Sequence, residues 1–210
     1  MLRISIVAEY ALLKRGGRMR KIATDKELAR CLTICGAARQ SDLERIVSKN
    51  RQKEWIKQGL CKKKAFHKSG SQKSDKCLVL TQKGREYVRK NYGLHGGQKV
   101  KEQYNHNCKL AEIYTKLSPS ERENVLTEQQ ARDWYKETIE QIREQSQEEA
   151  ERMLQELVEH KIAVVDMVVI RDAGIVQGIE VVTGSYSKEE IIAHQDFCEN
   201  MKIEYVEYKA

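Results

Sequence analysis

The chain has 210 residues, of which 40% are apolar and 33% are charged, with a single proline. This composition is typical of a folded, helix-rich, soluble protein and excludes a collagen-like or wholly disordered chain. The length allows one large domain or two small ones.

The formal net charge of +7 is divided very unevenly along the chain. Residues 1–117 contain 28 Lys and Arg against 10 Asp and Glu, a net charge of +18, whereas residues 118–210 contain 10 against 21, a net charge of −11. Like charges at this density repel one another unless a partner neutralises them. We therefore expect the basic part to meet phosphates and the acidic part to be repelled by them.

The six cysteines come without a recognisable secretion signal, because the opening residues MLRISIVAEYALL are apolar but too short and lack a cleavage site. No apolar run reaches the roughly 18 residues of a membrane helix, so we expect no membrane partner. We expect a cytoplasmic protein whose cysteines are reduced and packed in the core. A metal site remains an alternative, although no zinc spacing is matched by the candidate ligands Cys61, His67, Cys77, His106 and Cys108.

The first 93 residues contain signals for three short helices, a hairpin and a fourth helix. Apolar spacing and capping residues predict helices over 24–36 (capped by Thr24 or Asp25), 41–47, 48–58 and 81–93. Two β-prone runs, 60–68 and 76–81, flank the polar stretch SGSQKSD, which is typical of a flexible hairpin loop.

This order of elements, with Leu-Thr-x-x-Gly at residues 80–84, resembles the winged helix-turn-helix family of DNA-binding domains over about residues 22–93. The resemblance implies a recognition helix at 48–58 and a wing at 60–81. In such domains the recognition helix enters the major groove and its amino-terminal residues contact base edges.

The remaining chain predicts a hinge, helices and a small sheet. Glycines in GLHGGQK suggest a hinge, Pro119 ends the helix that precedes it, and the next helical region is either one helix or two. The predicted elements are helices over 101–117, 127–161 and 187–201, and strands over 162–170, 174–183 and 202–209. We therefore expect an α+β protein with an N-terminal winged helix-turn-helix domain at 1–93, a hinge at 94–100, and helices with a small α/β nuclease-like sheet at 101–210.

The helix over 48–58 has an outward face that suits DNA. If Trp55 points into the core, helical geometry turns Asn50, Lys53, Glu54 and Lys57 outward. We expect Glu54 to repel phosphates in wrong registers. Lys49 and Arg51 flank the amino end, where Arg51 matches the edge of guanine and Asn50 the edge of adenine.

Other cations in the basic part are expected to contact phosphates rather than bases. The wing carries six lysines, which are compact charges that suit phosphates: Lys62, Lys63, Lys64, Lys68, Lys73 and Lys76. The segment KRGGRMRK, with Arg15, Arg18, Arg20 and Lys21, is either an arm for an adjacent minor groove or a fraying basic segment.

Two strand carboxylates, Asp166 and Glu180, lie 14 residues apart in the second half. This arrangement is similar to the PD-(D/E)xK nuclease fold, in which such carboxylates hold Mg²⁺ and a lysine orients the attacking water. Glu128 matches a helical glutamate of some of these proteins, and the order of domains resembles the replication-relaxation family of plasmids and integrative elements. The catalytic pattern is incomplete, because Val165 replaces proline and Val182 replaces the lysine, which leaves Lys188 as the nearest substitute.

These observations predict a DNA-binding accessory protein of a mobile genetic element that binds double-stranded DNA without catalysis and needs no cofactor. Its process would be replication, conjugative transfer or transcription control. The chain would act alone, as a homodimer, or with other proteins of the element. The alternatives are a Mg²⁺-dependent endonuclease using Glu128, Asp166, Glu180 and Lys188, with Mg²⁺ on Asp166 and Glu180, and a protein-binding adaptor.

Overall fold

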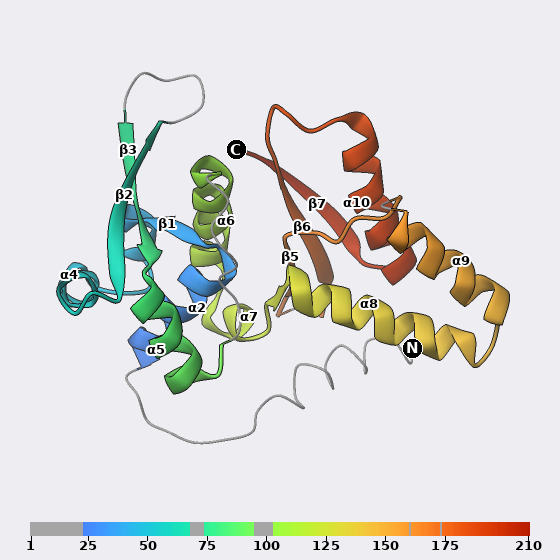
Figure 1. Ribbon diagram of the computed structural model, residues 1–210, viewed down its shortest axis with the longest axis horizontal. Helices are drawn as coiled ribbons and strands as arrows, with labels where there is room; N and C mark the ends of the chain where they lie inside the picture. The colour runs from blue at the N-terminus through green and yellow to red at the C-terminus, as the bar shows by residue number, and fades with distance from the viewer. Residues whose placement is uncertain (1–22, 68–73, 95–102, 160, 173) are drawn as a thin grey trace. The chain divides into compact units, whose positions relative to one another are not determined.

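The computed structural model describes residues 23–67, 74–94, 103–159, 161–172 and 174–210 (Figure 1). It divides the chain into two compact units, Met1–Leu117 and Ser118–Ala210. The boundary separates residues with a net charge of +18 from residues with a net charge of −11. Both units combine helices with a small sheet, which confirms the mixed α+β class. Among the described residues, none of the helices has the length and apolar character needed to cross a membrane.

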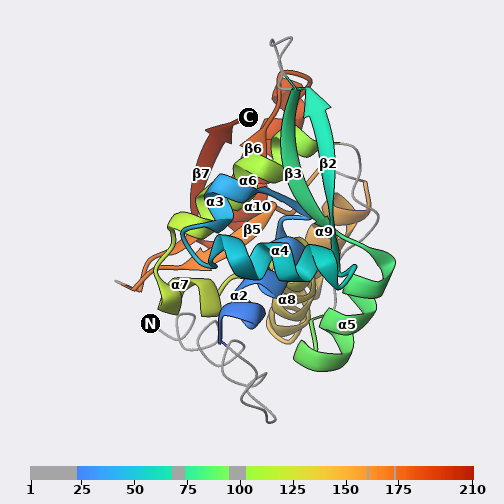
Figure 2. The ribbon, with the colours of Figure 1, turned by 90° about the vertical axis from the view of Figure 1, so that its left-hand side faces the viewer.

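The first unit surrounds a three-stranded antiparallel sheet in the order β1-β3-β2. Its elements are α2 (Ala23–Ile34), β1 (Ala37–Arg39), α3 (Gln40–Leu43), α4 (Lys49–Lys57), β2 (Cys61–His67), β3 (Ser74–Leu80), α5 (Gln82–Tyr92) and α6 (Tyr104–Lys116). Figure 2 shows α4 crossing below the β2–β3 hairpin, with α5 beside it. The helices and both hairpin strands were predicted from the sequence, whereas β1 was not.

Capping residues set the ends of these elements much as their sequence signals indicate. The Ser48 hydroxyl accepts a hydrogen bond from the Arg51 amide at the start of α4, and the Thr81 hydroxyl accepts one from Gly84 at the start of α5. Gly59 and Gly93 end these two helices with φ of 72° and 65°, a left-handed conformation that glycine adopts without strain. The helix predicted to begin at Ser41 starts one residue earlier, because Ser41 lies inside α3 and Arg39 occupies its N-cap.

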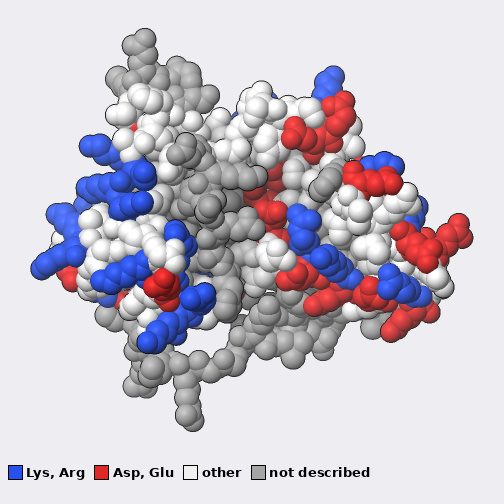
Figure 3. Space-filling view, in the orientation of Figure 1, with Lys and Arg blue, Asp and Glu red and all other residues white. Residues whose placement is uncertain are grey.

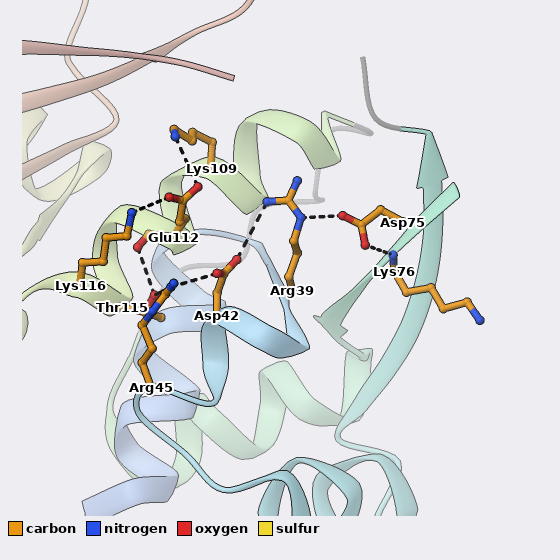
Figure 4. Close-up of polar contacts among 9 residues, drawn as sticks. All are labelled: Arg39, Asp42, Arg45, Asp75, Lys76, Lys109, Glu112, Thr115 and Lys116. Atoms are coloured by element: carbon orange, nitrogen blue, oxygen red, sulfur yellow. Dashed lines mark hydrogen bonds and ion pairs between the residues drawn. The ribbon is translucent and has the colours of Figure 1, made fainter. Parts of the chain in front are cut away.

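Helix α6 belongs to the first unit. It packs against β1, α2 and α3, and the Arg45 guanidinium lies 3.3 Å from the Thr115 hydroxyl (Figure 4). The Arg45 guanidinium also forms an ion pair with Asp42 at 2.9 Å. The division expected at residues 94–100 therefore differs from the observed one by this helix, and residues 95–100 of that expected hinge lie outside the described part of the chain.

The second unit is built on a four-stranded sheet in the order β4-β5-β6-β7. Its elements are α7 (Pro119–Glu123), β4 (Leu126–Thr127), α8 (Glu128–Arg143), α9 (Gln147–Val158), β5 (Met167–Ile170), β6 (Val176–Val182), α10 (Lys188–Met201) and β7 (Glu204–Lys209). Strand β6 pairs antiparallel with β5 and parallel with β7, and α10 makes the crossover between the two parallel strands. The helical region that sequence left as one helix or two consists of two, because α9 starts anew at its N-cap Ser146.

Candidate functional site

Helix α4 is fixed on the first unit by its inner face. Gln52 is fully buried, and its amide nitrogen donates hydrogen bonds to the backbone oxygens of Gln40 and Val47, both at 3.3 Å. Trp55, one turn further on, is also buried. These contacts tie α4 to α3 and to the turn between them, so the opposite face of α4 is held toward solvent.

The outward face of α4 carries the residues that the sequence predicted. Asn50 is exposed there, as are three lysines that we call the α4 lysines, Lys49, Lys53 and Lys57. Lys49 forms an ion pair with Glu44 at 3.3 Å, but its side chain keeps 68% of its surface exposed. Such an exposed pair is weak, so Lys49 can exchange Glu44 for another anion at little cost.

Arg51 is placed differently from its expected role. Its guanidinium donates two hydrogen bonds to the carboxylate of Asp25 on α2, whose side chain is only 5% exposed. Trp55 Nε1 donates to the same carboxylate at 3.2 Å. Because the forked donors of Arg51 are engaged within the unit, they are not presented for the edge of a guanine.

The β2–β3 hairpin adds a second row of cations. Lys62, Lys63 and Lys64 follow one another on β2 and are all exposed, as is Lys76 on β3. We call these four the hairpin lysines. Since successive residues of a strand point to opposite faces and β2 is an edge of the sheet, the hairpin presents charge from both faces. The predicted contacts Lys68 and Lys73 lie outside the described residues, and so does the predicted arm with Arg18 and Arg20.

Helix α5 contributes cations that the sequence interpretation overlooked. Lys83, Arg89 and Lys90 are exposed, and Figure 3 shows Lys and Arg side chains spread over the surface of the first unit. The Lys83 ammonium donates to the backbone oxygen of Gln58 at 2.8 Å, next to the carboxyl end of α4. The sequence alone could have identified these two lysines, because Lys83 and Lys90 are seven residues apart and therefore lie on one face of a helix.

In the second unit, Asp166 and Glu180 lie close together, and each carboxylate accepts a hydrogen bond from a main-chain amide. Glu180 Oε2 accepts from the Asp166 amide at 3.0 Å, and Asp166 Oδ2 accepts from the Val181 amide at 2.9 Å. Asp166 directly precedes β5 rather than lying inside it. The fold thus brings the two predicted carboxylates together, and one oxygen of each accepts a hydrogen bond from a backbone amide.

Glu180 is almost completely buried, at 1% exposure, and has two side-chain neighbours that the sequence interpretation missed. The Tyr186 hydroxyl donates to Glu180 Oε1 at 3.0 Å, and His194 Nε2 lies 3.4 Å from the same oxygen. Burial lowers the pKa of His194, and although the nearby carboxylate of Asp166 opposes this change, burial outweighs it. The His194 Nδ1 lies 3.1 Å from the Ala163 carbonyl, so this nitrogen carries the donated hydrogen.

The other two predicted catalytic residues lie on the surface. Glu128, at the start of α8, forms an exposed ion pair with Arg132 at 3.2 Å. Lys188 is the first residue of α10, where Ser187 forms the capping box with Glu190, and its side chain is exposed. Val182, at the position of the nuclease lysine, is buried. Val182 thus supplies no charge, and Lys188 begins a helix at the surface.

Comparisons of the chain with protein-family models, with curated proteins and with solved structures find no match.

Proposed function

We propose that the chain binds double-stranded DNA through its first unit, with α4 as the helix that enters the major groove and the β2–β3 hairpin as a wing on the backbone. The observation that carries the proposal is the joint exposure of the α4 lysines and the hairpin lysines on a helix and a hairpin that pack against each other. Phosphate contacts by such cations supply most of the affinity of DNA-binding proteins.

The chemistry of these side chains favours backbone binding with limited base reading. Lysine ammonium groups are compact charges that bind phosphate without a preferred base. Asn50 is the exposed residue of α4 whose amide can bond an adenine edge with two hydrogen bonds. Since Arg51 is held by Asp25, we assign it to the support of α4 and leave sequence preference to Asn50 and its neighbours. An α-helix suits the major groove of B-form DNA better than the deep, narrow groove of RNA.

We further propose that the acidic second unit serves assembly rather than catalysis. Asp166 and Glu180 are each bonded to a main-chain amide, and Glu180 is also bonded to Tyr186. The nuclease alternative needs these oxygens for Mg²⁺ and needs a lysine beside them, whereas Lys188 is an exposed residue at a helix start. Homodimerisation, or binding to other proteins of a mobile element, would fit such a unit and would multiply the phosphate contacts.

Charge reversal on α4 tests the DNA-binding proposal. The full chain carrying Lys53→Glu and Lys57→Glu should bind a labelled duplex at least about 30-fold more weakly than the original at moderate salt, because two phosphate contacts become repulsive. Lys136→Glu, at an exposed position of α8, is the matched control and should change affinity little. Equal affinities of the reversed and original chains would refute the proposal, and would favour a protein-binding adaptor.

Two further assays separate the remaining alternatives. Incubation with supercoiled DNA and Mg²⁺ should leave the DNA uncut, and cutting that disappears with Asp166→Ala would establish the endonuclease instead. Enrichment of bound fragments from a whole replicon should recover an origin, a transfer region or a promoter. The fragment recovered would distinguish replication, transfer and transcription control, the processes implied by the resemblance to replication-relaxation proteins.

A further inference from the structure

Two free thiols meet under the β2–β3 hairpin. Cys77 lies on β3 and Cys108 on α6, and both are completely buried. They belong to one apolar cluster with Ala37, Phe66 and Val79, which Tyr104 partly covers. The cluster thus joins a strand and a helix through two cysteines that are 31 positions apart in the chain.

The surroundings make the two thiols chemically unequal. The pKa of Cys77 is lowered, chiefly by the hydrogen bond from the Cys108 thiol; burial and the charge of Asp75 oppose this change, and the charge of Arg39 supports it. The pKa of Cys108 is raised, because it provides that hydrogen bond and because it is buried. Arg39 is the partner of Cys77 in the β1–β3 register. The Cys77 thiol also donates to the Lys64 backbone oxygen at 3.7 Å. Cys77 is therefore the more easily ionised thiol of the pair, and we assign it as the nucleophile and Cys108 as the thiol that resolves an adduct on it.

We propose that Cys77 and Cys108 are a dithiol site for small disulfides, which convert the pair into an intramolecular disulfide joining β3 to α6. The site does not depend on DNA binding. With oxidised glutathione as the oxidant, the Cys77 thiolate attacks one sulfur, breaks the S–S bond and releases one glutathione thiolate. Once α6 opens and water reaches Cys108, this thiol loses its proton and attacks Cys77 Sγ in the mixed disulfide, which releases the second glutathione as its thiolate. The protein loses two S–H bonds and gains one S–S bond, and its two protons end on two glutathione thiols.

Access to the buried pair requires local opening of α6 at its amino end. The N-cap residue of this helix, Gln103, makes no side-chain capping hydrogen bond, in contrast to Ser48 and Thr81 of α4 and α5. An uncapped first turn opens more readily than a capped one. Cys108 lies in the second turn of α6, so opening of this end uncovers the pair without unfolding the unit.

The same chemistry is disfavoured at another buried thiol of the unit. Cys61 lies at the start of β2, and burial alone raises its pKa to about 12. Because the pKa of Cys77 is lowered and that of Cys61 is raised, Cys61 is the weaker of the two as the first attacking thiol. Cys61→Ser is a suitable control, because it removes one buried thiol of the same unit without touching the pair.

Oxidation of the native full chain tests the site. After incubation with oxidised glutathione at pH 8, peptide mass spectrometry should find a cross-link between Cys77 and Cys108 that dithiothreitol removes. The closed loop of about 30 residues should raise the Tm by at least about 5 °C. Cys61→Ser should form the same cross-link. Absence of the cross-link, or scrambling among the other cysteines, would overturn the proposal.

Single variants of the pair separate its two roles. Cys108→Ser should accumulate glutathione on Cys77, because the resolving thiol is gone, whereas Cys77→Ser should react far more slowly with glutathione at either position. Circular dichroism of the reduced variants checks that they are folded. Should a variant fail to fold, the pH dependence of cross-linking in the original chain provides a second readout, with the rate levelling off below the ordinary thiol pKa of about 8.5. A rate that still rises tenfold per pH unit above that value would contradict an activated Cys77.

Discussion

The Arg51 guanidinium holds the buried carboxylate of Asp25 with two hydrogen bonds, which joins α4 to α2 across 26 positions of sequence. Trp55 donates to the same carboxylate and packs edge-on against Tyr87 of α5, with ring centroids 6.0 Å apart. Arg51 and Trp55 lie one turn apart on the inner side of α4. Their anchoring is what keeps Lys53 and Lys57 on the outer side.

Arg51→Ala should destabilise the first unit by about 2 kcal/mol, because it leaves the Asp25 carboxylate buried with one fewer charged partner. Urea denaturation followed by circular dichroism measures this loss. Asp25→Asn in the Arg51→Ala background should recover part of it, since a neutral amide is less costly to bury than an unpaired carboxylate. A variant that keeps full stability but loses DNA affinity would instead return Arg51 to base recognition.

Gly84→Ala should destabilise the packing of α5 by about 2 kcal/mol or more. A Cβ at this position would lie 2.0 Å from the Leu60 backbone oxygen, and the backbone cannot move aside as a side chain can. Gly59→Ala is the matched control, because a Cβ there meets no atom within 4 Å and its cost, about 1–2 kcal/mol, comes from the left-handed backbone alone. Thermal unfolding should rank the two variants in this order, and the reverse order would contradict the close approach of α5 to Leu60.

Glu112 on α6 gives a pH-dependent contribution to stability. Ion pairs with Lys116 at 2.6 Å and Lys109 at 3.3 Å lower the pKa of this carboxyl group (Figure 4). A lowered pKa stabilises the fold above the pKa of the unfolded chain, and this stabilisation is lost as the pH falls through the folded-state pKa.

Glu112→Gln should therefore lower the free energy of unfolding by at most about 1 kcal/mol at pH 7, because the pairs are partly exposed. The difference from the original chain should shrink as the pH falls below about 4. Glu86→Gln, whose partner Gln82 is neutral, is the control. A difference that stays constant from pH 7 to pH 3 would mean that packing, rather than charge, is responsible.

Glu180 should be a structural residue of the second unit. Glu180→Ala leaves the Asp166 amide and the Tyr186 hydroxyl without this acceptor and should cost about 3 kcal/mol. Tyr186→Phe removes one hydrogen bond and should cost about 1 kcal/mol. The two changes combined should cost less than their sum, because they share one interaction. Additive effects in denaturation curves would contradict the coupling of these two side chains.

Local sequence signals identified most helices and strands of this chain because capping and periodicity act over a few residues. Ser48, Thr81 and Ser187 were expected to begin helices, and each does. Strand β1 escaped prediction because its three residues, Ala37–Arg39, have no periodicity of their own and form a strand only by pairing with β3. The sequence also did not predict that α6 belongs to the first unit, because its contacts with β1 and α3 join segments far apart in sequence.

The candidate site was predictable to the extent that it depends on one element. The outward face of α4 follows from helical spacing around Trp55, and the hairpin lysines follow from the strand pattern. The engagement of Arg51 could not be foreseen, because Asp25 was read as a helix cap and the two meet only in the folded unit. Tyr186 and His194 were missed for the same reason, since only the fold brings them to Glu180.

The salt dependence of duplex binding tests most directly whether the cations of the first unit neutralise DNA phosphates. The logarithm of the binding constant, measured by fluorescence anisotropy between 50 and 300 mM salt, should fall linearly against the logarithm of salt concentration with a slope of about −3 to −6. Replacing Lys62 and Lys64 by Gln should make the slope shallower by about 2. A slope near zero, or one that these replacements leave unchanged, would contradict the account.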